Sequence, residues 1–270
     1  MVNDKPSVSS AQMHESFELQ ARRLGFDPTD KWIGGYVDYE WNHLRHLLMA
    51  LPVSLAQLPV LEFGCNVGAS AIVFAHLGAC VCACDIDPGM LELARWNALR
   101  HGRDEITFTF VPDSRCLPYA DGQFAFIACN SVLEYVSPDH RGAVMAELDR
   151  VLAPGGMILL TGTSNRVWPR EVHSRRWLTN YVPRAVDRLT GKYLQRGMSP
   201  WTARTGFGRC YDNLDSPDQN GFFARSRRAM GVPSSRLTPL LLLSRLLGVT
   251  PGLLTPNLSC LLRKRAPAAR

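Results

Sequence analysis

The stretch Leu61 to Gly68, LEFGCNVG, decides the fold class, because it joins a short apolar strand to a helix through a loop that contains glycines. The strand is expected at 59–63, a run apolar enough for burial on both faces of a sheet. The helix is expected at 69–77. Glycines in such a loop let the backbone turn tightly and approach a ligand closely. Taken alone, the loop is compatible with a nucleotide site or with a simple packing turn.

Strands and helices alternate on the C-terminal side of this loop. Further strands are expected at 80–85, 106–112, 124–130 and 157–162, and helices at 88–101 and 141–152. This alternation predicts a parallel sheet with right-handed crossovers. We therefore expect an α/β fold: a doubly wound, Rossmann-like, mostly parallel sheet of seven strands, with N-terminal helices and a lid-like insertion after the fifth strand.

The chain is expected to be organised in four segments. These are an N-terminal arm with capping helices (1–56), a ligand-binding core (57–163), a lid or substrate-side insertion (164–210), and C-terminal helices with a last strand that completes the same domain (211–270). The insertion contains tryptophans among many arginines. Gly155 and Gly156 are expected to form a turn before the fifth strand.

Charge is divided unevenly along the chain. Residues 1–162 carry a net charge of −8, whereas residues 163–270 carry +14. Such an asymmetry indicates either an anionic partner for the second half or solvated arginines on helix faces. The arginines and the leucines of 237–249 are also compatible with weak peripheral contact to an anionic membrane. We find no recognisable RNA-binding motif, so nucleic acid is not favoured as a partner.

Targeting and metal-binding signals are not evident. The first twelve residues lack the apolar core of a secretory signal, and the 237–249 run is too short and too interrupted to span a bilayer, so a soluble cytoplasmic protein is expected. Cys80, Cys82 and Cys84 alternate on an expected strand, and we interpret them as small buried side chains. Zinc ligands usually come from turns with wider spacing, so no metal site is predicted.

Two acidic residues sharpen the interpretation of the loop. Asp85 ends the second expected strand, 21 residues after Gly64, where a carboxylate can accept hydrogen bonds from ribose hydroxyls. Asp113 follows the third strand, where it could meet an adenine amino group. Each acid alone is equally compatible with a helix N-cap. Together, at the carboxyl ends of successive strands, they predict a nucleotide-containing ligand.

The order of these motifs resembles that of the class I methyltransferases that use S-adenosylmethionine (SAM). Their first motif is an acid followed by glycines spaced as G-x-G-x-G, and this chain has Glu62, Gly64, Asn66 and Gly68. Asn66 replaces the central glycine, which an asparagine can do because it tolerates positive φ. The segments at 85–94, 112–125, 129–136 and 148–161 resemble the later motifs, although Ala125 stands where an acid is usual. The resemblance covers about 59–163 and disfavours a nicotinamide dinucleotide.

The resemblance implies SAM as the cofactor and a set of residues that contact it. The set is Tyr36, Arg45, Glu62, Gly64, Asn66, Gly68, Asp85, Ile86, Asp113, Ser114 and Asn130. Arg45 would pair with the SAM carboxylate through two parallel hydrogen bonds. It is equally compatible with a surface arginine on an amphipathic helix, and Tyr36 with a packing aromatic.

The expected chemistry is in-line attack by a substrate nucleophile on the sulfonium methyl group. The protein has mainly to hold the two reactants close and aligned, and a general base helps when the nucleophile is a hydroxyl of high pKa. His173 is the candidate base, with Glu171 orienting it or acting alone; a loop histidine without a catalytic task is the alternative. Glu134 either lines the substrate pocket or begins a helix.

Within the family, the motif order resembles the small-molecule O-methyltransferases of ubiquinone biosynthesis. This resemblance implies transfer of a methyl group to a small-molecule O- or N-nucleophile that is aromatic, lipid-like or anionic. Asn130 is followed by Ser131 and Val132 rather than by Pro-Pro-Tyr, so the likeness to nucleic-acid and protein amide methylases fails. The alternatives are an RNA methyltransferase that uses the basic second half, and a non-catalytic SAM-binding protein. The oligomeric state is not predicted.

Overall fold

The computed structural model describes residues 4–192 and 194–266. The first three residues of the expected arm and the last four of the C-terminal tail lie outside these ranges. The chain forms two compact units, one of residues 1–128 with 151–153 and one of residues 129–150 with 154–270. This division falls inside the core predicted at 57–163, and the four-segment organisation stays a prediction.

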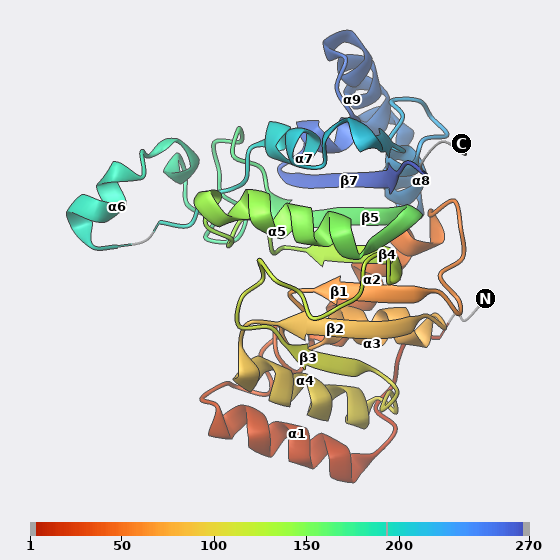
Figure 1. Ribbon diagram of the computed structural model, residues 1–270, viewed down its shortest axis with the longest axis vertical. Helices are drawn as coiled ribbons and strands as arrows, with labels where there is room; N and C mark the ends of the chain where they lie inside the picture. Colours follow the sequence, from red (N-terminus) through yellow and green to blue (C-terminus); the bar gives the residue numbers. More distant parts are fainter. Residues whose placement is uncertain (1–3, 193, 267–270) are drawn as a thin grey trace. The chain divides into compact units, whose positions relative to one another are not determined.

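Seven strands form one mixed sheet in the order β3-β2-β1-β4-β5-β7-β6 (Figure 1). Their bounds are β1 Pro59–Phe63, β2 Cys80–Asp85, β3 Thr107–Phe110, β4 Phe124–Asn130, β5 Leu152–Ser164, β6 Tyr211–Asn213 and β7 Asn257–Lys264. β1 pairs in parallel with β2 and β4, and β2 pairs in parallel with β3. β7 runs antiparallel to both β5 and β6. The predicted α/β fold with a mostly parallel seven-stranded sheet is therefore confirmed.

Four helices belong to the first unit. They are α1 Ala11–Arg23, α2 Tyr36–Met49, α3 Ala69–His76 and α4 Pro88–Arg100. α4 begins where the sequence predicts, because the Asp87 carboxylate accepts the N–H groups of Gly89 and Met90, and Pro88 suits the first turn. α1 packs against α4, and α2 packs against α3.

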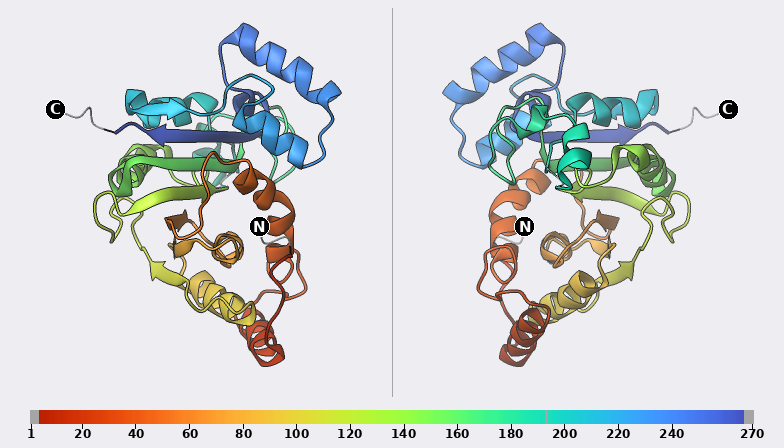
Figure 2. Two further views of the ribbon diagram at one scale, coloured as in Figure 1. Left: turned by 90° about the vertical axis from the view of Figure 1, so that its right-hand side faces the viewer. Right: turned by 90° about the vertical axis from the view of Figure 1, so that its left-hand side faces the viewer.

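α3 and α4 lie on the same side of β1, β2 and β3 (Figure 2). Both helices connect parallel strands that follow one another in the same direction across the sheet, and right-handed crossovers then place them on one face. α3 is buried along residues 69–75, and β1 is buried from Val60 to Phe63. The core of this unit therefore lies directly beneath the loop that joins β1 to α3.

The second unit contains the remaining helices. They are α5 Pro138–Val151, α6 Ala185–Thr190, α7 Pro200–Gly206, α8 Phe222–Ala229 and α9 Ser234–Leu247, with short 3-10 turns at Thr179–Tyr181, Gly208–Cys210 and Pro251–Leu254. Side chains of α8 and α9 form a small apolar cluster of Phe223, Ala224, Leu237 and Leu241. α8 also contacts β7.

Two local expectations were wrong, and one strand had not been assigned. Gly155 and Gly156 do not form a turn before β5, since the strand already begins at Leu152 and accommodates Gly155 at φ 78°. The short strand β6 was not foreseen, because three residues carry too little alternation to be recognised. Cys80 is exposed at the start of β2, while Cys84 is buried as expected.

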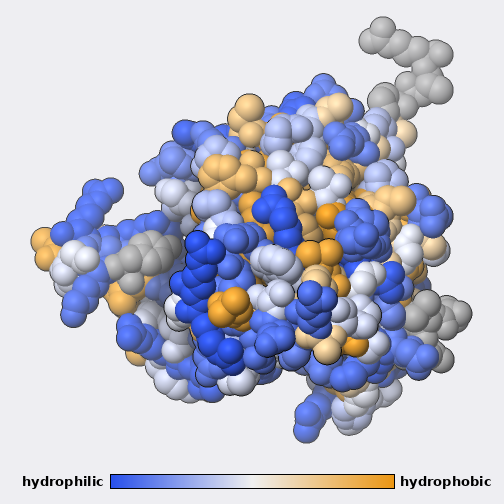
Figure 3. All heavy atoms as spheres, turned by 90° about the horizontal axis from the view of Figure 1, so that it is seen from below, coloured by the Kyte–Doolittle hydropathy of each residue, from blue (hydrophilic) through white to orange (hydrophobic). Residues whose placement is uncertain are grey.

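The face drawn in Figure 3 is largely polar. On the face drawn in Figure 3, hydrophilic side chains surround smaller groups of hydrophobic ones. Within the described ranges, no helix is both long enough and apolar enough to cross a membrane.

Candidate functional site

The loop between β1 and α3 adopts left-handed backbone at three of its residues. Gly64, Asn66 and Gly68 have φ values of 76°, 49° and 71°. Asn66 therefore takes the conformation for which a central glycine would normally be needed, and its side-chain oxygen accepts the N–H of Val67 at 2.7 Å. A Cβ atom on Gly68 would lie 3.1 Å from both the Ala94 Cβ and the Phe108 ring. Gly68 is thus required for both its conformation and its close packing.

Every backbone N–H group of residues 64–68 donates a hydrogen bond within the protein. Gly64 and Cys65 donate to the carbonyl of Cys84, Asn66 to the Asp85 carboxylate, Val67 to the Asn66 side chain, and Gly68 to the carbonyl of Cys65. A loop that cradles a pyrophosphate must instead offer free N–H groups to the phosphate oxygens. The loop is consequently unsuited to a dinucleotide and suits a ligand without phosphates.

Asp85 joins the loop to the end of β2. Its carboxylate accepts the N–H of Asn66 at 2.7 Å and that of Asp87 at 3.1 Å. A carboxylate has about four acceptor positions, so two remain for hydroxyl groups of a ligand. Ile86, the next residue, is 63% exposed, which provides apolar surface beside these positions.

A buried acidic group lies under the same loop. Glu62 and Glu40 are each only 3% exposed, and the Tyr36 hydroxyl is hydrogen-bonded to Glu40. Burial raises the pKa of Glu62 well above its usual range, and the negative charge of Glu40 adds to the rise, while hydrogen bonds from Ser70 and Ala71 oppose it. The second carboxylate oxygen of Glu62 is buried without a hydrogen-bond partner among the described residues.

These observations fit SAM. Its ribose offers two hydroxyl donors and its methionine part an ammonium group, and SAM carries a sulfonium cation where a dinucleotide carries phosphates. The Asp85 carboxylate suits the hydroxyls of the ribose. Tyr36 and Glu62 lie close to each other within the first unit, and Glu62 directly precedes the loop.

Asp113 lies after β3 and is exposed. Its carboxylate binds the guanidinium of Arg115 at 2.8–3.2 Å and also accepts the Arg115 backbone N–H. An adenine amino group would share this carboxylate with Arg115. The neighbouring Ser114 is half-buried.

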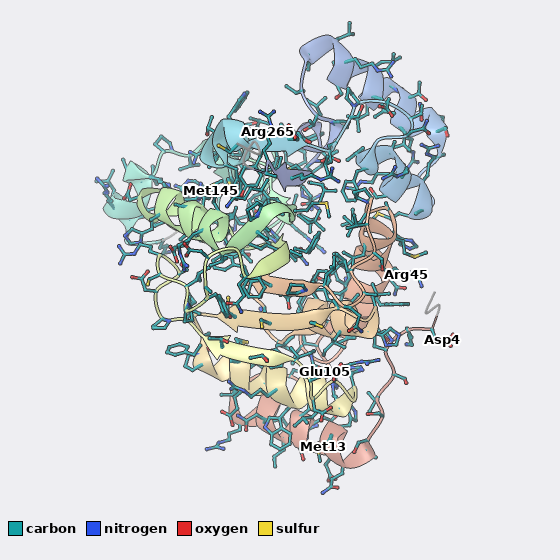
Figure 4. The ribbon with its side chains drawn as sticks, turned by 45° about the vertical axis from the view of Figure 1, so that its right-hand side comes forward. Asp4, Met13, Arg45, Glu105, Met145 and Arg265 are labelled. Atoms are coloured by element: carbon teal, nitrogen blue, oxygen red, sulfur yellow. The ribbon has the colours of Figure 1, made fainter. Side chains whose placement is uncertain are left out.

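Arg45 is not brought to this edge of the sheet. Its guanidinium stacks on Trp41 at 5.2 Å, and the Trp41 ring contacts His76, the last residue of α3. The ligand loop precedes the first residue of α3, so the helix separates the two by its length, about 12 Å. Figure 4 shows Arg45 near the tails of the β1 and β2 arrows, beside Asp4.

Asn97 is a site residue that the sequence did not reveal. It is fully buried on α4, and its amide donates to the Val67 carbonyl at 2.6 Å, while its oxygen accepts from Arg100 at 2.8 Å. It fixes the loop from beneath. A polar residue at helical spacing on α4 was the only available signal.

In the second unit, His173 is paired with Glu134 and not with Glu171. The imidazole Nε2 lies 2.9 Å from a Glu134 oxygen, and the Glu134 side chain is fully buried. The ring is also hydrogen-bonded to the backbone carbonyl of Gly162. Burial lowers the pKa of His173, but these bonds and the charge of Glu134 outweigh it, so the pKa is raised.

The contacts of His173 favour its charged form. A carboxylate oxygen and a backbone carbonyl are both acceptors, so contacts of the ring to both stabilise the imidazolium. An imidazolium has no lone pair with which to take a proton. The ring becomes a base only above its raised pKa.

Glu171 holds the loop that carries His173. It is fully buried, and its carboxylate accepts the N–H of Ser174 at 2.5 Å. Burial raises its pKa, but hydrogen bonds from Ser174, His173 and Ser164 outweigh the effect and lower it. Glu171 is therefore held as a carboxylate whose donors are supplied by its own loop.

Asn130 ends β4 beside Gly162 of β5. A Cβ on Gly162 would lie 2.4 Å from the Asn130 side-chain oxygen and 2.2 Å from the Ser131 hydroxyl. Gly162, at φ 68°, thus allows the two segments to approach closely. Within the described ranges, no group of three or more His, Cys, Asp or Glu side chains is arranged to hold a metal ion.

The chain is similar in sequence to known methyltransferases. A family profile described as "Methyltransferase domain" matches residues 60–156. A demethylmenaquinone methyltransferase of Parafrankia is 30% identical over 204 residues, which are 68% of this chain and 76% of the relative. A ubiquinone biosynthesis O-methyltransferase of Thiobacillus denitrificans is 30% identical over 128 residues, and here the chain spans only 53% of the relative.

Solved structures share the fold at lower identity. A SAM-dependent methyltransferase from Mesorhizobium loti has a TM-score of 0.53 at 19% identity, over 83% of this chain and 97% of the other. The [4+2]-cyclase SpnF has a TM-score of 0.54 at 16% identity, over 98% and 100%. Proteins named for different reactions thus share this architecture, and the reaction has to be argued from the site.

Proposed function

Because this chain belongs to the class I SAM-dependent methyltransferases, we propose that it transfers the methyl group of SAM to an oxygen or nitrogen nucleophile of a small-molecule acceptor. The observation that carries the proposal is the loop at 64–68, whose N–H groups all have partners within the protein and which has the Asp85 carboxylate and the buried Glu62 side chain beside it. Bound SAM supplies an electrophilic methyl group on a sulfonium cation.

The protein's own residues would act mainly by positioning. The Asp85 carboxylate would bind the ribose hydroxyls, Ile86 would contact the adenine, and Asp113 with Ser114 would lie beside the adenine edge. Holding two reactants in line removes much of the entropic barrier of a bimolecular reaction.

We further propose His173 as the group that takes the acceptor proton, with Glu134 orienting it and Glu171 fixing its loop. Because the ring is an imidazolium below its raised pKa, kcat/KM should rise with pH through a value above 6.5. His173→Gln should flatten this rise and lower the plateau about 10²-fold or more. An unchanged profile in the variant would remove His173 from the reaction.

The acceptor class is suggested by the relatives and by the second unit. Two relatives are named for menaquinone and ubiquinone biosynthesis. The segment after β5 exposes Trp168 and Trp177 close in sequence to Arg170, Arg175 and Arg176. Aromatic rings with cationic groups favour an aromatic or anionic acceptor. We therefore favour phenols, hydroxylated heterocycles and aromatic acids.

The test is formation of S-adenosylhomocysteine from SAM with a panel of these acceptors, followed by mass spectrometry of the product. A mass gain of one methyl group on a phenol or acid supports the proposal. Methyl transfer to total RNA that falls steeply with salt would favour the RNA alternative. SAM binding without turnover on any acceptor would favour a non-catalytic protein or another reaction on the same fold.

A further inference from the structure

The C-terminal helix α9 presents two different apolar faces. Leu237 and Leu241 are 2% and 3% exposed, and they pack on Phe223 and Ala224 of α8. This face repeats at helical spacing and is fully covered.

The other face is uncovered. Leu242, Leu243, Leu246 and Leu247 are 53%, 46%, 85% and 57% exposed. The spacing i, i+1, i+4, i+5 places all four on one side of two consecutive turns. Among the described residues eight leucines are exposed, and half of them lie on this face. Single exposed leucines are ordinary, whereas a contiguous group marks an interaction surface.

The segment of the chain that carries this face has charges of one sign. From residue 219 to the end the sequence contains nine Lys and Arg and no Asp or Glu. Arg225 and Arg228 of α8 and Arg236 of α9 are exposed. Arg236 precedes Leu243 by seven residues and Leu247 by eleven, so it lies on the same side of the helix as these leucines. Arg236 has no ion pair among the described residues.

These features indicate what kind of partner binds the leucine face of α9. Leucines on one face with arginines beside them match the surface of a bilayer that contains anionic lipids, where the side chains enter the interface and the guanidinium groups meet phosphates. A protein partner would need its own acidic rim, and a second copy of this chain would bring positive charge against positive charge. α9 has 14 residues, so it would lie along the surface.

We propose that the face of α9 formed by Leu242, Leu243, Leu246 and Leu247 docks the protein reversibly on an anionic membrane surface. The proposal does not depend on the acceptor. It would bring the enzyme to the phase in which an apolar acceptor concentrates.

The test is co-sedimentation of the full chain with vesicles of phosphatidylcholine alone or with about one third phosphatidylglycerol, at low and high salt. We expect binding to the anionic vesicles, at least tenfold weaker binding to the neutral ones, and loss at high salt. The double variant Leu243→Ser/Leu246→Ser should bind anionic vesicles at least tenfold more weakly. Arg236→Glu should weaken binding by a smaller factor.

Leu189→Ser is the matched control, because Leu189 on α6 is 85% exposed, as Leu246 is. Its binding should equal that of the wild type, and all variants should keep the thermal midpoint and the SAM affinity of the wild type. Equal loss in the control, equal binding to neutral vesicles, or no binding at all would overturn the proposal. A wild-type dimer in light scattering that becomes monomeric in the leucine variant would overturn it in favour of a second copy.

Discussion

Asp85 performs two tasks with one carboxylate, because it fixes the backbone at Asn66 and leaves oxygen lone pairs for a ligand. Removing the carboxylate should therefore reduce the affinity for SAM more than it reduces the stability of the fold. We expect Asp85→Ala to reduce SAM affinity at least about tenfold, or about 1.4 kcal/mol, in titration calorimetry.

Asp87→Ala is the matched control for Asp85. Asp87 is also a carboxylate at this edge, but it caps α4 by accepting from Gly89 and Met90. Its loss should cost about 1 kcal/mol of stability and leave SAM affinity unchanged. Equal loss of affinity in the two variants would show that the effect is structural.

Gly68 should tolerate no side chain. Gly68→Ala adds a Cβ 3.1 Å from both Ala94 and Phe108 at φ 71°, so it combines backbone strain with overpacking, and we expect a loss of about 2–4 kcal/mol in urea unfolding. Gly155→Ala separates the two causes, because Gly155 has φ 78° and nothing within 4 Å of its added Cβ. It should cost about 1–2 kcal/mol. Equal losses would mean that packing contributes nothing at Gly68.

For single residues, the sequence predicted the roles of those in the ligand loop better than the roles of those in the second unit. Asp85 and Asn66 were recognisable because their roles follow from position after a strand. Glu134 was not assigned to His173, because 39 residues separate them and only the return of the chain after β5 brings them together. Arg45 shows the converse: its spacing was suitable, but the direction of α2 places it at the other end of α3.

One buried acid contacts both β7 and α8. Asp215 is 1% exposed and accepts the N–H of Leu261 in β7. Burial raises its pKa from 3.8 to about 7, although Leu261 and the charge of Arg227 oppose the rise. The native state therefore holds this proton more tightly than the unfolded chain, in which the group ionises near pH 4.

The stability of the native state should therefore fall as the pH rises from about 4 to 7. The contribution of Asp215 to the free energy of unfolding is fully present below about pH 4 and is lost as the pH rises towards 7. The loss amounts to a few kcal/mol at most. Asp215→Asn should abolish this slope in urea unfolding between pH 4 and 7. Asp218→Asn should retain it, because hydrogen bonds, above all from the Ser216 side chain, lower the pKa of Asp218, which therefore titrates below this window. A slope that persists in Asp215→Asn would assign it to another group.

At the scale of elements, the sequence predicted those with a clear period. β1, β2, β4 and the helices between them were close to their observed bounds, since burial on both faces makes the strands continuous apolar runs. The segment 164–210 was predicted only as a lid or substrate-side insertion. It is organised by contacts that follow no helix or strand period, such as those of buried Arg196, which binds the Asp187 carboxylate at 2.6–2.8 Å and the carbonyls of Val182, Pro183 and Leu194.

Over the whole molecule, the eight free cysteines differ in their exposure to solvent and so test which parts of the fold are buried. Cys80, Cys116 and Cys210 are exposed, Cys82 is partly buried, and the other four are buried. Burial raises the pKa of Cys84 to about 12 and that of Cys65 well above its usual range, so these thiols are rarely ionised.

Labelling with an aromatic disulfide should therefore modify three cysteines rapidly in the native protein, Cys82 more slowly, and the remaining four only on unfolding. Mass spectrometry of the labelled peptides measures each site. Rapid labelling of Cys65 or Cys84 would contradict the packing beneath the ligand loop.

The overall topology was predictable because the alternation of strands and helices and the handedness of their connections leave few possible arrangements. The place of β7 between β5 and β6 was not, since no local pattern specifies a strand's neighbours.

That place of β7 has a consequence for how the protein is made. β5 ends at Ser164, and β7, its neighbour in the sheet, begins at Asn257, about 90 residues later. At roughly 5–20 residues per second, a ribosome needs about 5–20 s to produce the intervening chain. During this interval one edge of β5 has no neighbouring strand. Unpaired backbone groups at a strand edge readily pair with other chains. The nascent protein is therefore at its most vulnerable to aggregation after its ligand-binding loop has been synthesised and before its last strand emerges.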